Sequence, residues 1–138
     1  MTHIHESVQI AASIEEVWAY FTQSDKIAEW LMPNTFQAGL GETFTMDCPP
    51  GIGSGAPISC EIQELSAPAD GAARLVYTWV IEDPRADTLL DISLRQVNDT
   101  TYVDIIHSGW PDGEEELRTR HEMGWKHLLG DRLRGCLE

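Results

Sequence analysis

The chain has 138 residues, of which 42% are hydrophobic and 8% aromatic, as in an ordinary globular protein rather than a disordered one. This length favours one domain, which we expect to span residues 1–138. The formal net charge is −14, with only nine Lys plus Arg, so a phosphate backbone or an anionic membrane would be repelled. We therefore expect neither nucleic acid nor membrane as a partner.

The first third of the chain predicts one strand and two short helices. Residues 3–10 alternate between apolar and polar side chains, which is typical of a half-buried strand. Ser13 and Glu16 form a capping-box pattern, so a helix should begin here. A second helix is expected to start at Ser24 and to run through Leu31, before Pro33 ends it.

From residue 35 to residue 108 the helical period gives way to strand-like alternation. The apolar side chains recur at every second position in 44–48 and 58–62, and three further segments are rich in β-branched and aromatic residues: 74–81, 88–94 and 101–107. No helical segment separates these runs, and Asn98-Asp99 resembles a turn. An antiparallel meander is the expected connection.

A long helix from about 113 to 136 closes the chain. Asp112 is a candidate N-cap, acidic residues crowd the first turn, and Arg132 and Arg134 lie near the other end, as the helix dipole favours. At about 100° per residue, one face collects a mixed set of side chains: Leu117, His121, Trp125, Leu128, Leu129, Leu133 and Cys136. His121 and Trp125 should therefore point toward the sheet.

The predicted order is a strand, two short helices, an antiparallel run and one long helix, which is an α+β architecture. It resembles the helix-grip fold of the START-like (SRPBCC, polyketide cyclase-like) superfamily. Local motifs resemble more closely the homologues of the activator of heat shock protein 90 ATPase, over nearly the whole chain. These motifs are IAASIEEVWAYFT at 10–22, EW at 29–30, GLGETFTM at 39–46, LVYTWV at 75–80, HSGW at 107–110 and GW at 124–125.

This resemblance implies a curved antiparallel sheet wrapped around the long C-terminal helix, with a cavity between them and the two short helices closing one end. Members of such families carry ligands, cyclise or aromatise polyketides, or act as co-chaperones. Fold alone does not select among these roles.

One pattern resembles a dinucleotide-binding motif and another a zinc-binding motif, but the residues around each argue against that function. The loop 49–57 contains Gly51, Gly53 and Ala56 at dinucleotide-fingerprint spacing, but a strand-like segment follows where a helix is required. We expect a hairpin loop or a flap at the cavity mouth instead. His121-Glu122 begins an H-E-x-x-H pattern that lacks its second histidine. His127 cannot replace it in binding the same metal ion, because it lies about 240° around the helix from His121. No metal or other cofactor is predicted.

The three cysteines indicate a reducing environment and no catalytic or metal-binding role. Cys48, Cys60 and Cys136 form no C-x-x-C pair and no nucleophile motif, so we interpret them as small core residues. No export signal and no membrane-spanning run of about 20 apolar residues is visible. These features favour a cytoplasmic protein.

His107 and His121 are the most informative polar residues, since both are expected to face the same cavity. An imidazole can orient a ligand oxygen or move a proton, but it can equally satisfy a buried backbone group. The indole groups nearby need hydrogen-bond partners if they are buried. The expected ligand-binding residues are Trp30, Phe44, Met46, Trp79, His107, His121 and Trp125.

The favoured function is binding of a small hydrophobic or aromatic molecule between the sheet and the last helix, with no residue assigned as catalytic. One alternative is a cyclase- or hydrolase-like enzyme that uses His107 or His121 as a general acid or base. Another is a stress-response module of the co-chaperone type with a chaperone partner, which rests on the family resemblance alone and is not favoured. The ligand and the oligomeric state, a homodimer included, stay open.

Overall fold

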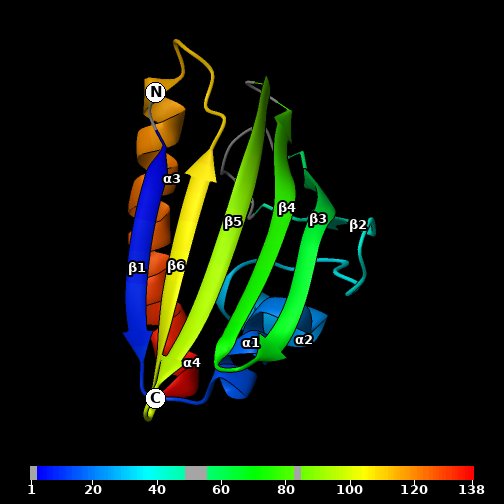
Figure 1. Cartoon of the computed structure of the whole chain (residues 1–138). Coiled ribbons are helices and arrows are strands. Elements are labelled where there is room, and N and C mark those ends of the chain that lie inside the picture. The colour runs from blue at the N-terminus through cyan, green and yellow to red at the C-terminus, as the bar shows by residue number, and fades with distance from the viewer. Residues whose placement is uncertain (1–2, 49–55, 83–84) are drawn as a thin grey trace.

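Six antiparallel strands form a single curved sheet whose concave face carries the long C-terminal helix (Figure 1). The computed structural model describes residues 3–48, 56–82 and 85–138. The strands are β1 (Ile4–Ile10), β2 (Thr43–Met46), β3 (Ile58–Ala69), β4 (Ala72–Glu82), β5 (Arg85–Val97) and β6 (Thr100–Ser108). The helices are α1 (Ile14–Thr22), α2 (Ser24–Trp30), α3 (Glu115–His127), the π-helix η1 (Leu128–Leu133) and α4 (Arg134–Leu137). The predicted α+β helix-grip fold is confirmed.

The strand order β1-β6-β5-β4-β3-β2 makes β2 to β6 the predicted antiparallel meander, with β1 added at the edge beside β6. The hairpin between β5 and β6 turns at Asn98-Asp99, where Asn98 has the positive φ of 57° that tight hairpin turns require. Strands β3 and β4 are joined in the same way through Asp70 and Gly71, with φ of 53° and 76°. Short turns of this kind fix which side chains face the helix.

The two short helices follow β1 as predicted and cover the lower end of the sheet in Figure 1. The capping box at the start of α1 is confirmed, because the Glu16 backbone N–H donates to Ser13 Oγ and the Glu16 carboxylate accepts from the Ser13 backbone N–H. Helix α2 ends at Trp30, one residue earlier than expected, and Leu31 is its C-terminal cap residue.

The C-terminal helix is long, but it is neither capped nor wound as the sequence predicts. Glu114, rather than Asp112, is the N-cap residue, and its side chain forms no capping hydrogen bond. The prediction for Asp112 is therefore wrong. Gly113, with φ of 89°, adds a left-handed turn residue between Asp112 and the helix, so the helix begins later. From Leu128 to Leu133 the α-helix widens into a π-helix before α4 ends the chain.

Helix α3 with its extension packs along β1 and β6, and its buried residues are Trp125, Leu129 and Leu133. The other predicted members of this face are only half-buried, namely Leu117, His121, Leu128 and Cys136. Cys60 lies in the core, whereas Cys48, beyond the end of β2, and Cys136 pack against its edge. The buried stripe is thus narrower than the sequence pattern suggests.

Replacing Leu129 with Ala tests this packing. Leu129 is 1% exposed, so we expect the free energy of unfolding to fall by about 2–5 kcal/mol in a urea titration. Met123 is 66% exposed on the same helix assembly, and Met123→Ala should change it by less than about 0.5 kcal/mol. Equal effects of the two substitutions would contradict the orientation of the helix described above.

Candidate functional site

Five rings from three parts of the chain meet between the sheet and α3, and we refer to them as the ring cluster. They are Trp79 on β4, His107 on β6, Trp110 in the following loop, and His121 and Trp125 on α3. The His107 and His121 ring centroids lie 5.6 Å apart, so the two histidines are brought together as predicted.

Trp79 is in contact with most of the ring cluster. Its ring centroid lies 5.5 Å from those of His107 and Trp125. The His121 ring is 6.3 Å away and stands nearly perpendicular to the indole, at 84°. Edge-to-face contacts of this kind add to the stabilisation that burial itself supplies.

His107 joins the helix to the sheet through both of its ring nitrogens. The Trp125 indole N–H donates to His107 Nδ1 over 3.0 Å, and His107 Nε2 lies 2.8 Å from Thr88 Oγ1. An indole nitrogen can only donate, so Nδ1 accepts and Nε2 carries the proton. The Thr88 hydroxyl, which accepts from Nε2, then donates to the Trp79 carbonyl oxygen over 2.5 Å. These bonds form one chain with a defined direction, from α3 through β6 and β5 to β4.

This chain of hydrogen bonds requires a neutral His107. Burial lowers the pKa of His107 well below its usual value, and the neighbouring His121 ring adds to the effect. Protonation at Nδ1 would remove the acceptor that the Trp125 indole needs. Both nitrogens of His107 are therefore committed to holding helix and sheet together, and neither is free for a ligand.

His121 is held differently. Its Nδ1 donates to the Leu117 carbonyl oxygen over 3.0 Å, one helical turn earlier, while its Nε2 is bonded to none of the described residues. Burial lowers the pKa of His121, and the bond to Leu117 partly offsets this. A neutral His121 thus keeps a free acceptor at Nε2, on a side chain that is only half-buried.

Gly109 allows Trp110 to fold back onto His107. The residue has φ of 91°, and a Cβ atom there would lie 3.0 Å from the Asp87 carbonyl oxygen, which explains why glycine stands at this position. The Trp110 indole N–H then donates to the His107 carbonyl oxygen, and the two ring centroids are 4.5 Å apart. Trp110 covers the ring cluster at the point where β6 ends.

One polar atom of the ring cluster is left without a partner. Trp79 is 2% exposed, and its Nε1–H forms no hydrogen bond with any residue in the described part of the chain. Burying such a donor unpaired costs about 1–3 kcal/mol. This indole points to a missing acceptor.

The seven predicted ligand-binding residues fall into two groups. Trp79, His107, His121 and Trp125 belong to the ring cluster, whereas the other three lie nearer to α1, α2 and β2. The Trp30 indole N–H donates to the Tyr20 carbonyl oxygen, and its ring meets that of Phe21 at 5.2 Å. This second group is Trp30, Phe44 and Met46, each at most 3% exposed. Nothing polar in it awaits a partner among the described residues.

Tyr77 connects the two groups. Its ring lies 5.0 Å from that of Phe44 on one side and is stacked at 6.5 Å with that of Trp79 on the other. Burial raises the pKa of Tyr77 well above its usual value and that of Cys60 to about 12, so both stay protonated near neutral pH. Neither is a nucleophile or a base at that pH.

Two hollows lie away from the seven predicted residues. One, of about 490 Å³, crosses the outer face of strands β3 to β6, and the other, of about 280 Å³, lies among α1, α2 and the C-terminus. Their linings include Arg74, Arg95 and Asp104 in the first case and Tyr20, Lys26 and Cys136 in the second. The predicted cavity between sheet and helix remains a prediction.

The sequence did not indicate the hydrogen-bonding roles of Thr88 and Trp110. Thr88 is 3% exposed and occupies an inward position in β5, on the same face as Leu90 and Ile92, where alternation alone would have placed it. Trp110 stands in the quoted HSGW motif without an assigned contact. The loop 49–57 was predicted to form a hairpin loop or a flap at the cavity mouth, and its residues 49–55 lie outside the described part of the structure.

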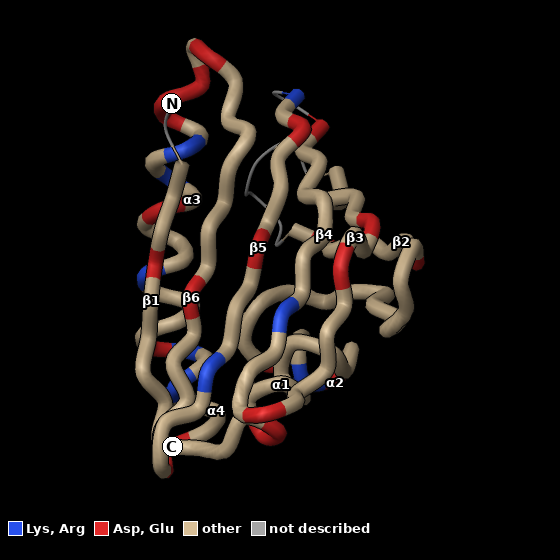
Figure 2. The backbone as a smooth tube through the Cα atoms, in the orientation of Figure 1, with Lys and Arg blue, Asp and Glu red and all other residues tan. Residues whose placement is uncertain are grey.

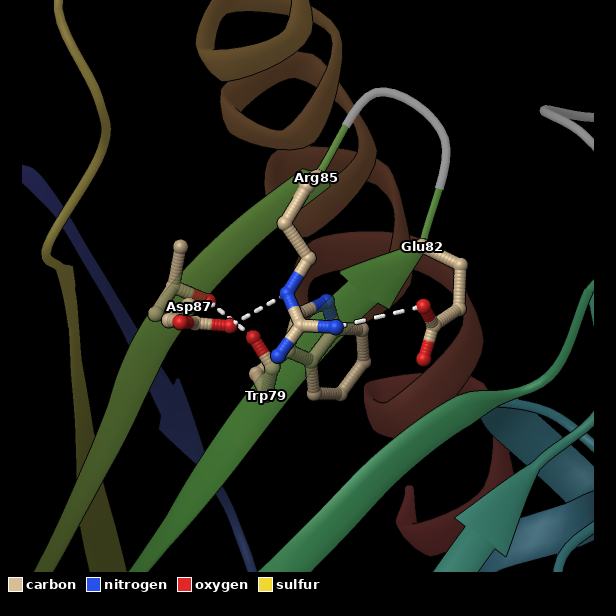
Figure 3. A network of polar contacts seen from close by, with 5 residues as sticks. Trp79, Glu82, Arg85 and Asp87 are labelled. Atoms are coloured by element: carbon tan, nitrogen blue, oxygen red, sulfur yellow. Dashed lines mark hydrogen bonds and ion pairs between the residues drawn. The ribbon is translucent and has the colours of Figure 1, made fainter.

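The surface around the sheet is acidic and carries ordinary exposed ion pairs. Arg85, at the start of β5, donates to Asp87 over 2.7 Å and to Glu82 over 3.3 Å (Figure 3). Asp and Glu lie on the strands, hairpin ends and helices, with Lys and Arg interspersed among them (Figure 2). Among the described residues, no group of three or more His, Cys, Asp or Glu side chains is placed to hold a metal ion.

Comparisons with known proteins agree with this architecture. A family model described as "Activator of Hsp90 ATPase homolog 1-like protein" matches residues 11–138. A search of curated proteins found no match. No helix in the described residues is both long and apolar enough to cross a membrane.

Several solved structures superimpose over nearly the whole chain. A Mesorhizobium loti protein shares 24% identity at a TM-score of 0.86, covering 99% of this chain and 96% of its own. A Bacillus halodurans protein shares 26% identity at a TM-score of 0.81, covering 100% and 98%. The Aha1 dimer from Colwellia psychrerythraea shares 19% identity at a TM-score of 0.78, covering 100% and 97%.

Thr88→Val tests the hydrogen-bond chain. Valine keeps the shape of threonine but leaves His107 Nε2–H and the Trp79 carbonyl oxygen without their partner. We expect the free energy of unfolding to fall by about 1–3 kcal/mol in chemical denaturation. Thr43→Val, at an exposed position of β2, should leave it within about 0.5 kcal/mol. A loss no larger than that of the control would rule out the chain as a stabilising element.

We expect the stability of the fold to decrease in mild acid because of His107 and His121. The pKa values of His107 and His121 are lower in the folded chain than the usual 6.5, so below pH 6.5 the unfolded chain binds more protons. The free energy of unfolding should therefore decrease between pH 6.5 and 5.5, by up to about 1.4 kcal/mol per pH unit for each histidine. Urea titrations across this range measure the slope.

Matched variants separate the contributions to this slope. His121→Gln should make the decrease smaller, whereas Thr43→Val, at an exposed position of β2, should leave it unchanged. A slope near zero in the unmodified protein would show that neither histidine is held neutral by the fold.

Proposed function

Since the chain belongs to the family of activator of Hsp90 ATPase homolog 1-like proteins, with the START-like helix-grip fold, we propose that it binds a small apolar or aromatic molecule between the sheet and α3. The observation that carries the proposal is the ring cluster, a group of aromatic rings in which two polar atoms lack partners among the described residues. Sites for small molecules commonly combine apolar and aromatic walls with a few such polar groups.

The contacts restrict where the ligand would lie. His107 and Trp125 are engaged with each other, and the indole of Trp30 is engaged with Tyr20. These residues shape the walls of the site in our proposal. Trp79 Nε1 and His121 Nε2 are left to meet the ligand directly. The half-buried His121 and Trp110 mark the edge through which it would enter.

Binding is favoured over catalysis for a chemical reason. A general base must reach its substrate with a free nitrogen, and both nitrogens of His107 are already bonded to protein groups. A cyclase- or hydrolase-like reaction would depend on His121 Nε2, and no described contact gives that ring an acidic or tyrosine partner. We therefore do not assign an enzymatic role.

The remaining aspects of the proposal follow from the whole chain. We place it in the cytoplasm as a single START-like domain, because its three cysteines are free thiols and a reducing compartment keeps them so. A homodimer is compatible with the proposal, since one chain supplies every residue of the site. Nothing in the described contacts singles out a chaperone-binding surface, so the co-chaperone alternative and the stress-response role remain unsupported.

A titration with neutral aromatic and acyl compounds tests the proposal. Naphthalene, 1-naphthol and methyl octanoate should produce a saturable change in tryptophan fluorescence, since three of the rings in the cluster are indoles. Calorimetry on the same compounds should give a matching stoichiometry of one per chain. A broad panel that leaves both signals unchanged would refute the proposal.

Two variants locate the binding. His121→Trp places a larger ring at the entry edge, and we expect it to weaken binding at least about tenfold by occupying ligand space. Met123→Trp adds the same indole to an exposed position of α3 and should leave the affinity within about twofold. Equal affinities in the two variants would place the ligand elsewhere, and the two surface hollows would then be examined.

A further inference from the structure

We infer that the ligand of the ring cluster carries a neutral carbonyl oxygen and that Trp79 Nε1–H donates a hydrogen bond to it. This inference rests on the function proposed above and specifies the class of ligand. The hydrogen bonds formed by the indole donors support it.

Three other indoles have a protein acceptor. Trp125 donates to His107 Nδ1, Trp110 to the His107 carbonyl oxygen and Trp30 to the Tyr20 carbonyl oxygen. The Trp79 carbonyl oxygen is also satisfied, through Thr88. Trp79 Nε1–H is the one buried side-chain polar atom in the described residues without a partner. The fold thus supplies acceptors for similar donors but none for this one.

An indole nitrogen can only donate, so its missing partner must be an acceptor. The acceptor has to fit among rings, because Trp79 is surrounded by Tyr77, His107, His121 and Trp125. A planar aromatic ketone or aldehyde presents its oxygen at the edge of a flat apolar body. That shape suits a donor located within a group of rings.

Charge distinguishes a carbonyl from a carboxylate. An anion at this position would be buried beside two histidines that burial keeps neutral, with no cation of the ring cluster to balance it. The chain also carries a formal net charge of −14, which opposes the approach of an anion. A neutral oxygen avoids both costs.

A matched pair of probes tests the inference. Acetophenone and α-methylstyrene have nearly the same planar shape, but the first has a carbonyl oxygen where the second has a CH₂ group. The alkene is the more apolar compound and gains more from leaving water. The relevant quantity is therefore the ratio of the two association constants and how that ratio changes with Trp79→Phe.

We expect the ketone-to-alkene ratio to fall about tenfold in Trp79→Phe, the magnitude of one lost hydrogen bond. Trp18→Phe, on the half-buried part of α1, should leave the ratio within about twofold. In the unmodified protein with ¹⁵N-labelled tryptophan, acetophenone should move the Trp79 indole proton downfield and α-methylstyrene should not. This spectrum carries the test even if the Phe variant fails to fold.

The outcomes separate this inference from the proposed function. If both probes bind but neither the ratio nor the indole proton responds, the ligand carbonyl is refuted and the binding function stands. A water molecule as the acceptor gives that same result. If neither probe binds, the inference fails, and the broader titration above decides whether the proposed function fails with it.

Discussion

A neutral histidine between helix and sheet is the constraint on which the interior depends. The long helix brings an indole N–H, a group that can only donate, against the sheet. His107 Nδ1 supplies the acceptor, and its Nε2–H continues the chain through Thr88 to the Trp79 carbonyl oxygen. Four elements are connected in this way. A charged imidazole could not hold the same position, since it has no acceptor to offer.

The series of hydrogen bonds uses both nitrogens of His107. In our proposal, structural and ligand-binding roles therefore fall to different atoms of the same ring cluster. His107, one of the two histidines that the sequence offered as a general acid or base, is the one that joins helix to sheet. Among the described residues, the indole donor of Trp79 and the Nε2 acceptor of His121 have no partner. In our proposal the same ring cluster stabilises the contact between helix and sheet and receives a molecule at its edge.

The sequence predicted most of the architecture and part of the site. Alternation placed the strands, and the capping box placed α1, because these signals arise between residues close in the chain. The cap at Asp112 was wrong, since the left-handed Gly113 delays the helix start. The π-helical segment from Leu128 was also not foreseen. The local hydrophobic pattern does not distinguish such a widened turn from an ordinary α-helix.

For the site, the sequence determined that His107, His121 and Trp125 share one interior face, because strand and helix periods fix the direction of each side chain. It could not determine which nitrogen meets which partner. The roles of Thr88 and Trp110, and the unpaired nitrogen of Trp79, arise from residues far apart in the chain that only the folded sheet brings within hydrogen-bond distance. Hydrogen bonds act over about 3 Å, so the division between structural and ligand-facing atoms was decided by tertiary structure alone.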